Sequence, residues 1–438
     1  MKRLALSLLV PCLTLVAGVG QLSAAVTTTT LHSFDHDDGW QPIGALIDGG
    51  DGYLYGTTQY GGVGVTNPAG TVFRITPGGS LSSLYTFDFQ VTGDEPFAGV
   101  LRLGDGTLFG TTRGSGSFNG SVFRLGATGD FTNLHTFTGY FVGADAGHPQ
   151  AALVEGGDGN LYGTTTDGGA SNVGALYRID AGGSYTIVHS FRGGLAPEQD
   201  GATPIGALVL GDDSALYGTT SAGGPTQPSP SSGTVFRYTP GVSGVTTLHA
   251  FKGSDGASPN STLVKARDGY LYGTTSGGGA HNAGTVFRIA ENGGDFESLH
   301  SFDSLNSPVG LAAGSDGNLY GTTSTGGANY LGTVYRLRPN GSFETVFSFS
   351  SLNAGGYGPR APLIQAGDGD FYGTTFSGGE TSAKCGGGCG TVFKIEGADI
   401  LVPEPATALG GAAAGSGLGL VAGLRRLRRS RDRERIHL

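Results

Sequence analysis

Histidine, aspartate and basic residues recur at regular positions in this sequence, and such residues serve in acid–base catalysis and metal binding. The histidines lie in copies of an L-H-S-F-like segment, at His32, His135, His189, His249 and His300. An aspartate precedes each L-Y-G-T-T-like segment, at Asp51, Asp105, Asp158, Asp213, Asp268, Asp316 and Asp368. A basic residue follows a V-F pair or its equivalent, at Arg74, Arg124, Arg178, Arg237, Arg288, Arg336 and Lys394. To form one catalytic or metal site, several of these repeated residues would have to come together at one point in the fold.

The spacing of these residues argues against such a meeting. Because strands lie about 4.8 Å apart and each unit has four, equivalent positions in neighbouring units should be at least about 15 Å apart. Two units also break the histidine pattern, with Tyr85 and Phe347 in its place. We therefore interpret the sets as structural hydrogen-bonding groups, with Arg–Asp pairs joining adjacent turns. We predict no catalytic residue, no cofactor and no metal site.

A glycine-centred pentapeptide marks seven tandem units. Its glycines are Gly56, Gly110, Gly163, Gly218, Gly273, Gly321 and Gly373, at steps of 48 to 55 residues. A period near fifty among β-forming residues and turn glycines indicates a propeller. Four strand-like segments make up each unit, and in the fifth they are 261–266, 270–275, 284–290 and 295–302. The central glycine predicts close approach of the adjacent sheet's backbone.

The two ends of the repeat array complement each other. The segment T-T-T-T-L-H-S-F at 27–34 has no unit before it, while the seventh unit ends at 391–395 without such a segment. A closed ring explains both observations and removes the exposed sheet edges. We therefore predict an all-β fold for residues 26–400. It is one seven-bladed β-propeller of four-stranded blades, in which the N-terminal strand completes the last blade.

The repeat pattern L-Y-G-T-T, then G-G, then G-T-V-F-R-I, resembles the GloVer tandem repeats of bacterial surface proteins. The resemblance covers nearly all of the chain between its two ends. It implies a surface protein, and it implies no activity for particular residues.

The N-terminus has the composition of a targeting segment. Residues 1–25 combine Lys2 and Arg3 with an apolar stretch and a small-residue end. This pattern predicts a secretory signal peptide that is cleaved after Ala25. A lipoprotein site at Cys12 is the less favoured alternative, because Pro11 stands where a small residue belongs.

Residues 401–438 contain a V-P-E-P-A motif at 402–406, an uncharged stretch at 406–424 and a basic tail at 425–438. The stretch is long enough for a transmembrane helix, and seven arginines after it favour the cytoplasmic side. The arrangement resembles the PEP-CTERM sorting signal, in which a membrane exosortase recognises the motif, here Pro403, Glu404 and Pro405. It implies transient insertion in the inner membrane, then the surface or matrix of a Gram-negative bacterium. An ordinary tail anchor is the alternative.

The net charge and the cysteines limit which partners and which cellular compartment are expected for this protein. Without its two ends the chain keeps 16 of 25 basic and 32 of 35 acidic residues, a formal charge of −16. This charge argues against nucleic acid as a partner. In an exported protein, Cys385 and Cys389 of C-G-G-G-C should form a local disulfide, with two free thiols as the alternative.

In a four-stranded meander the connections alternate between two faces, and here the variable connections share one face. We place a ligand surface there, because binding residues concentrate on loops held by a rigid scaffold. Its aromatic and acidic candidates suit a sugar or a protein partner: Asp37, Asp38, Trp40, Tyr140 and Tyr357, with Asp94, Glu95, Phe141, Glu198 and Asp200 around them. The segment at 35–39 also offers oxygen ligands for calcium, although it matches no complete calcium loop.

Two function hypotheses follow. The first is an exported, non-catalytic propeller that binds exopolysaccharide or protein partners in the envelope or biofilm matrix. The alternative is a polysaccharide hydrolase or lyase, which would need an acid and a base about 5–10 Å apart for glycoside hydrolysis. No non-repeating motif marks such a pair. A structural coat protein, finally, would bind no ligand.

Overall fold

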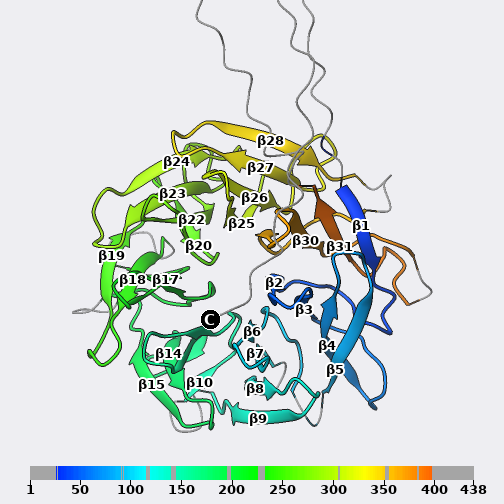
Figure 1. Cartoon of the computed structure of the whole chain (residues 1–438). Helices are drawn as coiled ribbons and strands as arrows, with labels where there is room; N and C mark the ends of the chain where they lie inside the picture. The colour runs from blue at the N-terminus through cyan, green and yellow to red at the C-terminus, as the bar shows by residue number, and fades with distance from the viewer. Residues whose placement is uncertain are drawn as a thin grey trace, which may run out of the picture. The chain divides into compact units, whose positions relative to one another are not determined.

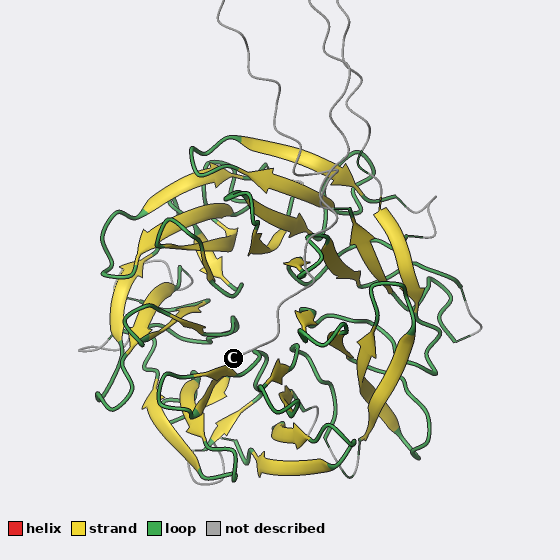
Figure 2. Cartoon of the chain, viewed as in Figure 1, coloured by secondary structure: helices red, strands yellow, loops and turns green. Residues whose placement is uncertain are grey.

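The structure is a computed structural model that describes residue 26 and residues 28–396, except 90, 92, 115–118, 140–144, 195–198, 225–231, 304–305, 351–354 and 382–383. All regular elements in these residues are β-strands. They form seven antiparallel sheets arranged as the blades of a ring (Figures 1 and 2). The prediction of an all-β, seven-bladed propeller is confirmed.

Each blade runs from an inner strand, which has only two residues in six of the blades, to an outer strand (Figure 1). Blade 1 contains β2 (Ile47–Asp48), β3 (Leu54–Thr58), β4 (Pro68–Ile75) and β5 (Leu81–Asp88). Blade 2 contains β6 (Leu101–Arg102), β7 (Leu108–Thr112), β8 (Ser121–Leu125) and β9 (Phe131–Thr136). Blade 3 contains β11 (Val154–Glu155), β12 (Leu161–Thr165), β14 (Ala175–Ile179) and β15 (Tyr185–Ser190). Blade 4 contains β16 (Val209–Leu210), β17 (Leu216–Thr220), β18 (Thr234–Tyr238) and β19 (Thr246–Ala250).

The remaining blades follow the same order. Blade 5 contains β21 (Val264–Lys265), β22 (Tyr270–Gly277), β23 (Thr285–Ala290) and β24 (Glu297–Ser301), and β20 (Ala257–Pro259) also pairs with β22. Blade 6 contains β25 (Pro308–Ala313), β26 (Leu319–Thr323), β27 (Thr333–Leu337) and β28 (Phe343–Ser348). Blade 7 contains β29 (Ile364–Gln365), β30 (Phe371–Thr375), β31 (Thr391–Ile395) and β1 (Thr28–Ser33). A separate small pair joins β10 (Ala146–Gly147) to β13 (Asp167–Gly168).

The N-terminal strand closes the ring as predicted. β1 pairs antiparallel with β31, so that Thr28 lies opposite Ile395 and Ser33 opposite Thr391. Blade 7 therefore takes three strands from the end of the array and its outer strand from the beginning. The sequence segment 27–34 is the strand that the seventh unit lacks.

The L-Y-G-T-T strands form the buried interior of each blade, and their glycine is required by a close side-chain contact. A Cβ atom on Gly56 would lie 2.5 Å from the ring of Phe73 in the next strand, and 2.8 Å from Leu46. The prediction that this glycine contacts the backbone of the adjacent sheet is therefore wrong, because the contacting group is a side chain of the same blade. The glycine makes room for an aromatic ring of its own blade, in keeping with the close packing of protein interiors.

The repeated aspartates mostly bond within their own blade. In six blades the tyrosine hydroxyl of L-Y-G-T-T donates to the aspartate of the preceding turn at 2.6–2.9 Å. The expected Arg–Asp pairing occurs between Arg237 and Asp213, at 2.6 Å. Arg288 and Arg336 instead contact glutamates of the outer strands. Most of these polar groups therefore stabilise single blades.

Several predictions concern residues outside the described part of the chain: Ala25, Tyr140, Phe141, Glu198, the motif Pro403, Glu404 and Pro405, and the stretch 406–424. Within the described residues, no helix has the length and apolarity that crossing a membrane requires.

Candidate ligand-binding face

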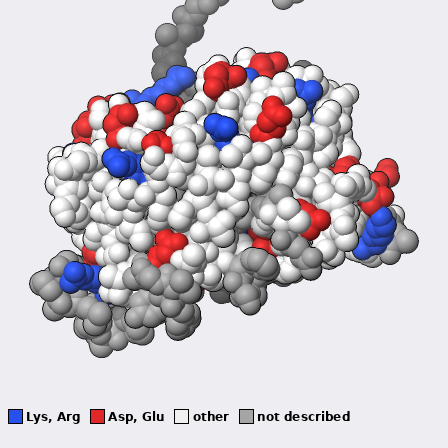
Figure 3. Space-filling view, turned by 90° about the horizontal axis from the view of Figure 1, so that it is seen from below, with Lys and Arg blue, Asp and Glu red and all other residues white. Residues whose placement is uncertain are grey.

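The variable connections lie on one face of the propeller. Backbone bridges join blade-to-blade links to the loop between the second and third strands of the following blade, at Trp40–Tyr60, Ala202–Ala222 and Tyr357–Ser377. We call this the loop face, and the opposite side with the tight turns the turn face. On the side wall visible in Figure 3, most charged side chains lie toward the two rims.

The repeated histidines orient the links on the loop face. His32 contacts Asp38 at 2.5 Å, and the pairs His189–Asp200 and His249–Asp255 have the same arrangement at 2.7 and 3.0 Å. In each case the other carboxylate oxygen accepts a backbone N–H three residues after the histidine, at Asp35, Arg192 and Lys252. The histidines are spread around the ring, one to a link, and they act as structural hydrogen-bonding groups.

Each of these aspartates is followed by a glycine that packs against at least one threonine of the next blade. The side chain of Thr234 donates to the carbonyl of Asp200 and contacts Thr220 at 2.8 Å. Gly201 has a φ of +102°, and a Cβ atom there would lie 2.0 Å from the Thr220 hydroxyl oxygen. We call this contact the Asp-Gly latch, which recurs at 38–39 and 255–256. The latch connects neighbouring blades at these three boundaries, and no sequence pattern had predicted it.

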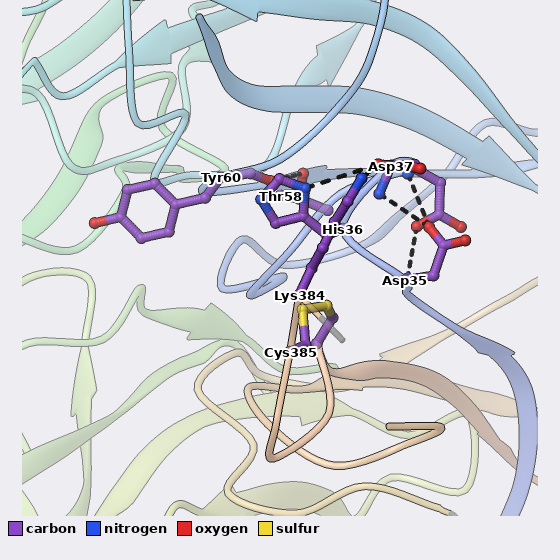
Figure 4. Close-up of a disulfide and its surroundings, with 9 residues drawn as sticks. Asp35, His36, Asp37, Thr58, Tyr60, Lys384 and Cys385 are labelled. Carbon is purple, nitrogen blue, oxygen red and sulfur yellow. Dashed lines mark hydrogen bonds and ion pairs between the residues drawn. A yellow bond between two sulfur atoms is a disulfide. The ribbon is translucent and has the colours of Figure 1, made fainter. Parts of the chain in front are cut away.

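Three of the predicted ligand residues surround the disulfide loop, residues 384–390. Cys385 and Cys389 are joined, with Cα atoms 5.4 Å apart. Lys384 extends from this loop to an ion pair with Asp37 (Figure 4). Trp40 packs against the core cluster that contains both cysteines. On the other side, a Cβ atom on Gly387 would lie 3.8 Å from the Tyr357 hydroxyl.

The acidic segment at 35–39 does not form a shared cation site. Asp35 accepts the backbone N–H groups of Asp37 and Asp38, while the Asp38 side chain is directed to His32. Among the residues that the structure describes, no group of three or more His, Cys, Asp or Glu side chains is placed to hold a metal ion.

A groove lies beside blade 1, next to Trp40. The hairpin of β4 and β5 is longer than its counterparts, with Pro68 opposite Asp88 and the Phe89 N–H bonded to the Asn67 carbonyl at 3.0 Å. This extension forms one wall of a groove of about 550 Å³. Its lining residues are Tyr60, Thr66, Asn67, Pro68, Ala69, Phe89, Asp94 and Glu95. The volume lies in the range of small-molecule sites.

Glu95 is the centre of a polar network in this groove. Its carboxylate accepts a hydrogen bond from the Tyr60 hydroxyl at 2.9 Å and another from Arg113 at 3.2 Å. Burial, together with the bond to Glu95, raises the pKa of Tyr60 to about 12, so its hydroxyl remains a donor at neutral pH. Both Glu95 oxygens accept hydrogen bonds, which suits recognition better than proton donation to a leaving group.

Part of this site is predictable from the sequence. The variable face includes Asp94, Glu95 and Trp40, and Trp40 is hydrogen-bonded to Tyr60 through both backbone groups. Tyr60 and Arg113 were missed. Their signal was a departure from the repeat, since each follows a T-T pair at the start of a loop whose sequence differs in every unit.

These features define a closed seven-bladed propeller with one diversified face. The chain belongs to the Gloeobacter/Verrucomicrobia repeat family, whose profile matches residues 19–142, 139–307 and 304–408. No curated protein matches the sequence.

The solved structures that resemble this chain include two gluconolactonases. A gluconolactonase from Xanthomonas campestris is 14% identical, with a TM-score of 0.43, over 86% of this chain and 92% of its own. The periplasmic gluconolactonase of Pseudomonas aeruginosa is 17% identical, with a TM-score of 0.46, over 77% of this chain and 98% of its own. Likeness at this level assigns no activity to this chain.

Proposed function

We propose that this protein is an exported, surface-associated and non-catalytic propeller that binds a polysaccharide of the envelope or biofilm matrix. In this proposal the N-terminal signal directs export, and an exosortase-type enzyme processes the C-terminal sorting signal. The propeller then presents its loop face to the matrix.

The observation that carries the proposal is the groove beside blade 1. It combines an aromatic wall residue, Phe89, whose side chain is 37% exposed, with the amide of Asn67 and the carboxylate of Glu95. Aromatic rings pack against the apolar faces of sugars, and amides and carboxylates bond their hydroxyls. A rigid ring of seven sheets supports these groups, so little conformational entropy is lost on binding.

The polar network favours binding over hydrolysis. A glycoside hydrolase needs one carboxyl that donates a proton and a second group that attacks or activates water. Glu95 is instead an acceptor for Tyr60 and Arg113, and it is only 8% exposed. This arrangement makes Glu95 a recognition group rather than the proton donor.

Calorimetry of the full exported protein with exopolysaccharide from its host tests the proposal, and reducing ends are assayed in parallel. We expect saturable binding and no new reducing ends. Phe89→Ala should weaken binding about five- to tenfold, as for the loss of one aromatic contact. Tyr330→Ala is the control, because Tyr330 is a 64% exposed aromatic in the loop between β26 and β27 of blade 6 and does not line the groove.

Three results would contradict the proposal. Release of reducing ends over time would favour the hydrolase or lyase alternative. Equal losses in the Phe89 and Tyr330 variants would place the binding surface elsewhere. Failure of the polysaccharide to bind would leave a protein partner or a coat function as the better explanation.

A further inference from the structure

The groove beside blade 1 has an excess of negative charge. Asp94 and Glu95 line it and are 2% and 8% exposed. At its rim, Asp88 accepts the backbone N–H of Thr66, which also lines the groove. Arg113 is the cation bonded to Glu95. Three carboxylates and one guanidinium therefore lie in or beside the groove, and the local charge is negative.

Two of these carboxylates are buried, so their negative charge is little weakened by dissolved salt. Buried charges are screened by salt much less than exposed ones. Tyr60 adds no charge, because burial and the bond to Glu95 raise its pKa to about 12. A uronic acid polymer would therefore bring its anions against Asp94 and Glu95. A neutral polymer could use only the hydrogen-bonding capacity of the groove.

The carboxylate of Glu95 also has capacity for a further donor. An ionised carboxylate has about four acceptor positions, and the bonds from Tyr60 and Arg113 use two of them. A ligand amine that enters beside these bonds would form a charge-assisted hydrogen bond, roughly twice as strong as a neutral one. The same ligand needs an apolar surface to meet Phe89, which also lines the groove.

Resting on the polysaccharide binding proposed above, we propose that the groove selects a polymer of amino sugars whose amines are free and protonated. The sugar ring packs against Phe89, and an amine is bonded by Glu95 with support from the charge of Asp94. This assigns the ligand class and the residue that determines specificity.

Four probes of equal length test the selectivity by calorimetry on the full exported protein, at about pH 6, where a sugar amine is protonated. They are oligomers of glucosamine, N-acetylglucosamine, galacturonate and lysine. The glucosamine oligomer should bind about tenfold more tightly than the N-acetylglucosamine oligomer, the size of one charge-assisted hydrogen bond. The galacturonate oligomer should bind most weakly of the sugars.

A variant of the same shape isolates the charge. Glu95→Gln keeps an acceptor for Tyr60, and it should reduce the preference for glucosamine over N-acetylglucosamine to below about threefold. Asp295→Asn is the control for net charge. Asp295 is exposed on the turn face at a φ of +52°, a conformation that asparagine adopts readily. It should leave the preference unchanged.

The outcomes separate this inference from the proposed function. If both hexosamine oligomers bind equally, or if Glu95→Gln keeps the preference, the selectivity is overturned while polysaccharide binding stands. Tight binding of the galacturonate oligomer has the same meaning. If the lysine oligomer binds as tightly as glucosamine, the groove recognises charge alone and the sugar class is wrong. If no sugar binds, the proposed function fails as well.

Discussion

The join in blade 7 differs from the corresponding join in every other blade. In blades 1 to 6 a short turn connects the third strand to the fourth, as residues 76–80 do between β4 and β5. In blade 7, β31 and β1 come from opposite ends of the array and meet through a ladder of hydrogen bonds. The disulfide loop lies beside this join, and its Lys384 contacts Asp37 in the link that follows β1.

This difference separates two kinds of contact. The Asp-Gly latch is common to the closure, at Asp38, and to internal boundaries, as at Asp255. The disulfide is particular to the closure, since Cys385 and Cys389 are the two cysteines of the propeller sequence. The repeat itself thus provides the packing between blades, and non-repeating residues supplement the one join that has no covalent turn.

The largest effect should come from a pair of matched core substitutions. Phe34 and Phe251 follow equivalent outer strands, are at most 1% exposed, and pack edge-on against Phe73 and Phe287. Replacing either with alanine should cost about 3–5 kcal/mol of unfolding free energy. Only Phe34→Ala should also release β1, because no turn tethers β1 to β31.

Hydrogen exchange distinguishes the two variants. The amides of β31 should exchange faster in Phe34→Ala, while those of β18, next to β19, should keep their protection in Phe251→Ala. Identical exchange profiles would mean that the missing turn has no consequence for local stability.

A smaller effect should follow from loss of the disulfide. The double variant Cys385→Ser, Cys389→Ser should lose about 2 kcal/mol, the chain-entropy value for a short closed loop. Differential scanning calorimetry with and without reductant measures it. Lys384→Gln serves as the control, because the ion pair with Asp37 is exposed to solvent and should contribute little to stability. An unchanged melting temperature in the double variant would exclude a stabilising role.

The smallest effect should be a pH dependence of stability that comes from the partly buried histidines of the outer strands. Burial lowers the pKa of His249 and of His300, while Asp255 and Asp303 oppose the shift. The unfolded chain therefore binds protons first as pH falls below about 6.5, and stability decreases toward the lower folded-state pKa. Urea unfolding at pH 7.5 and pH 5.5 should show this loss, and His249→Gln should reduce it. A variant with the same pH slope as the native protein would contradict the assignment.

Ring closure could be predicted from the sequence because the residues show at which strand of a repeat unit the array begins and at which strand it ends. The segment 27–34 matches the last strand of each unit, and the seventh unit stops at 391–395. Strand order follows from these two observations without knowledge of side-chain contacts. The pairing of β1 with β31 is the direct result.

The Asp-Gly latch and the groove could not be predicted in the same way. The latch aspartate follows its histidine by six residues at Asp38 and by eleven at Asp200, because the links differ in length. What the latch aspartates share is their position relative to the next blade, not their distance along the sequence. The groove depends on the extended hairpin of blade 1 and on the left-handed backbone of Glu95, with a φ of +55°. Neither is encoded in a local pattern.

The order of synthesis gives the pairing of Thr28 with Ile395 a further meaning. β1 is made first, and the strand that receives it is made near the end of the chain. Until then β1 has no sheet to join, and the edge of an unfinished propeller is open to pairing with other chains. The cell must therefore protect this protein from aggregation until residue 395 has been made, and a chain interrupted earlier can never complete its ring.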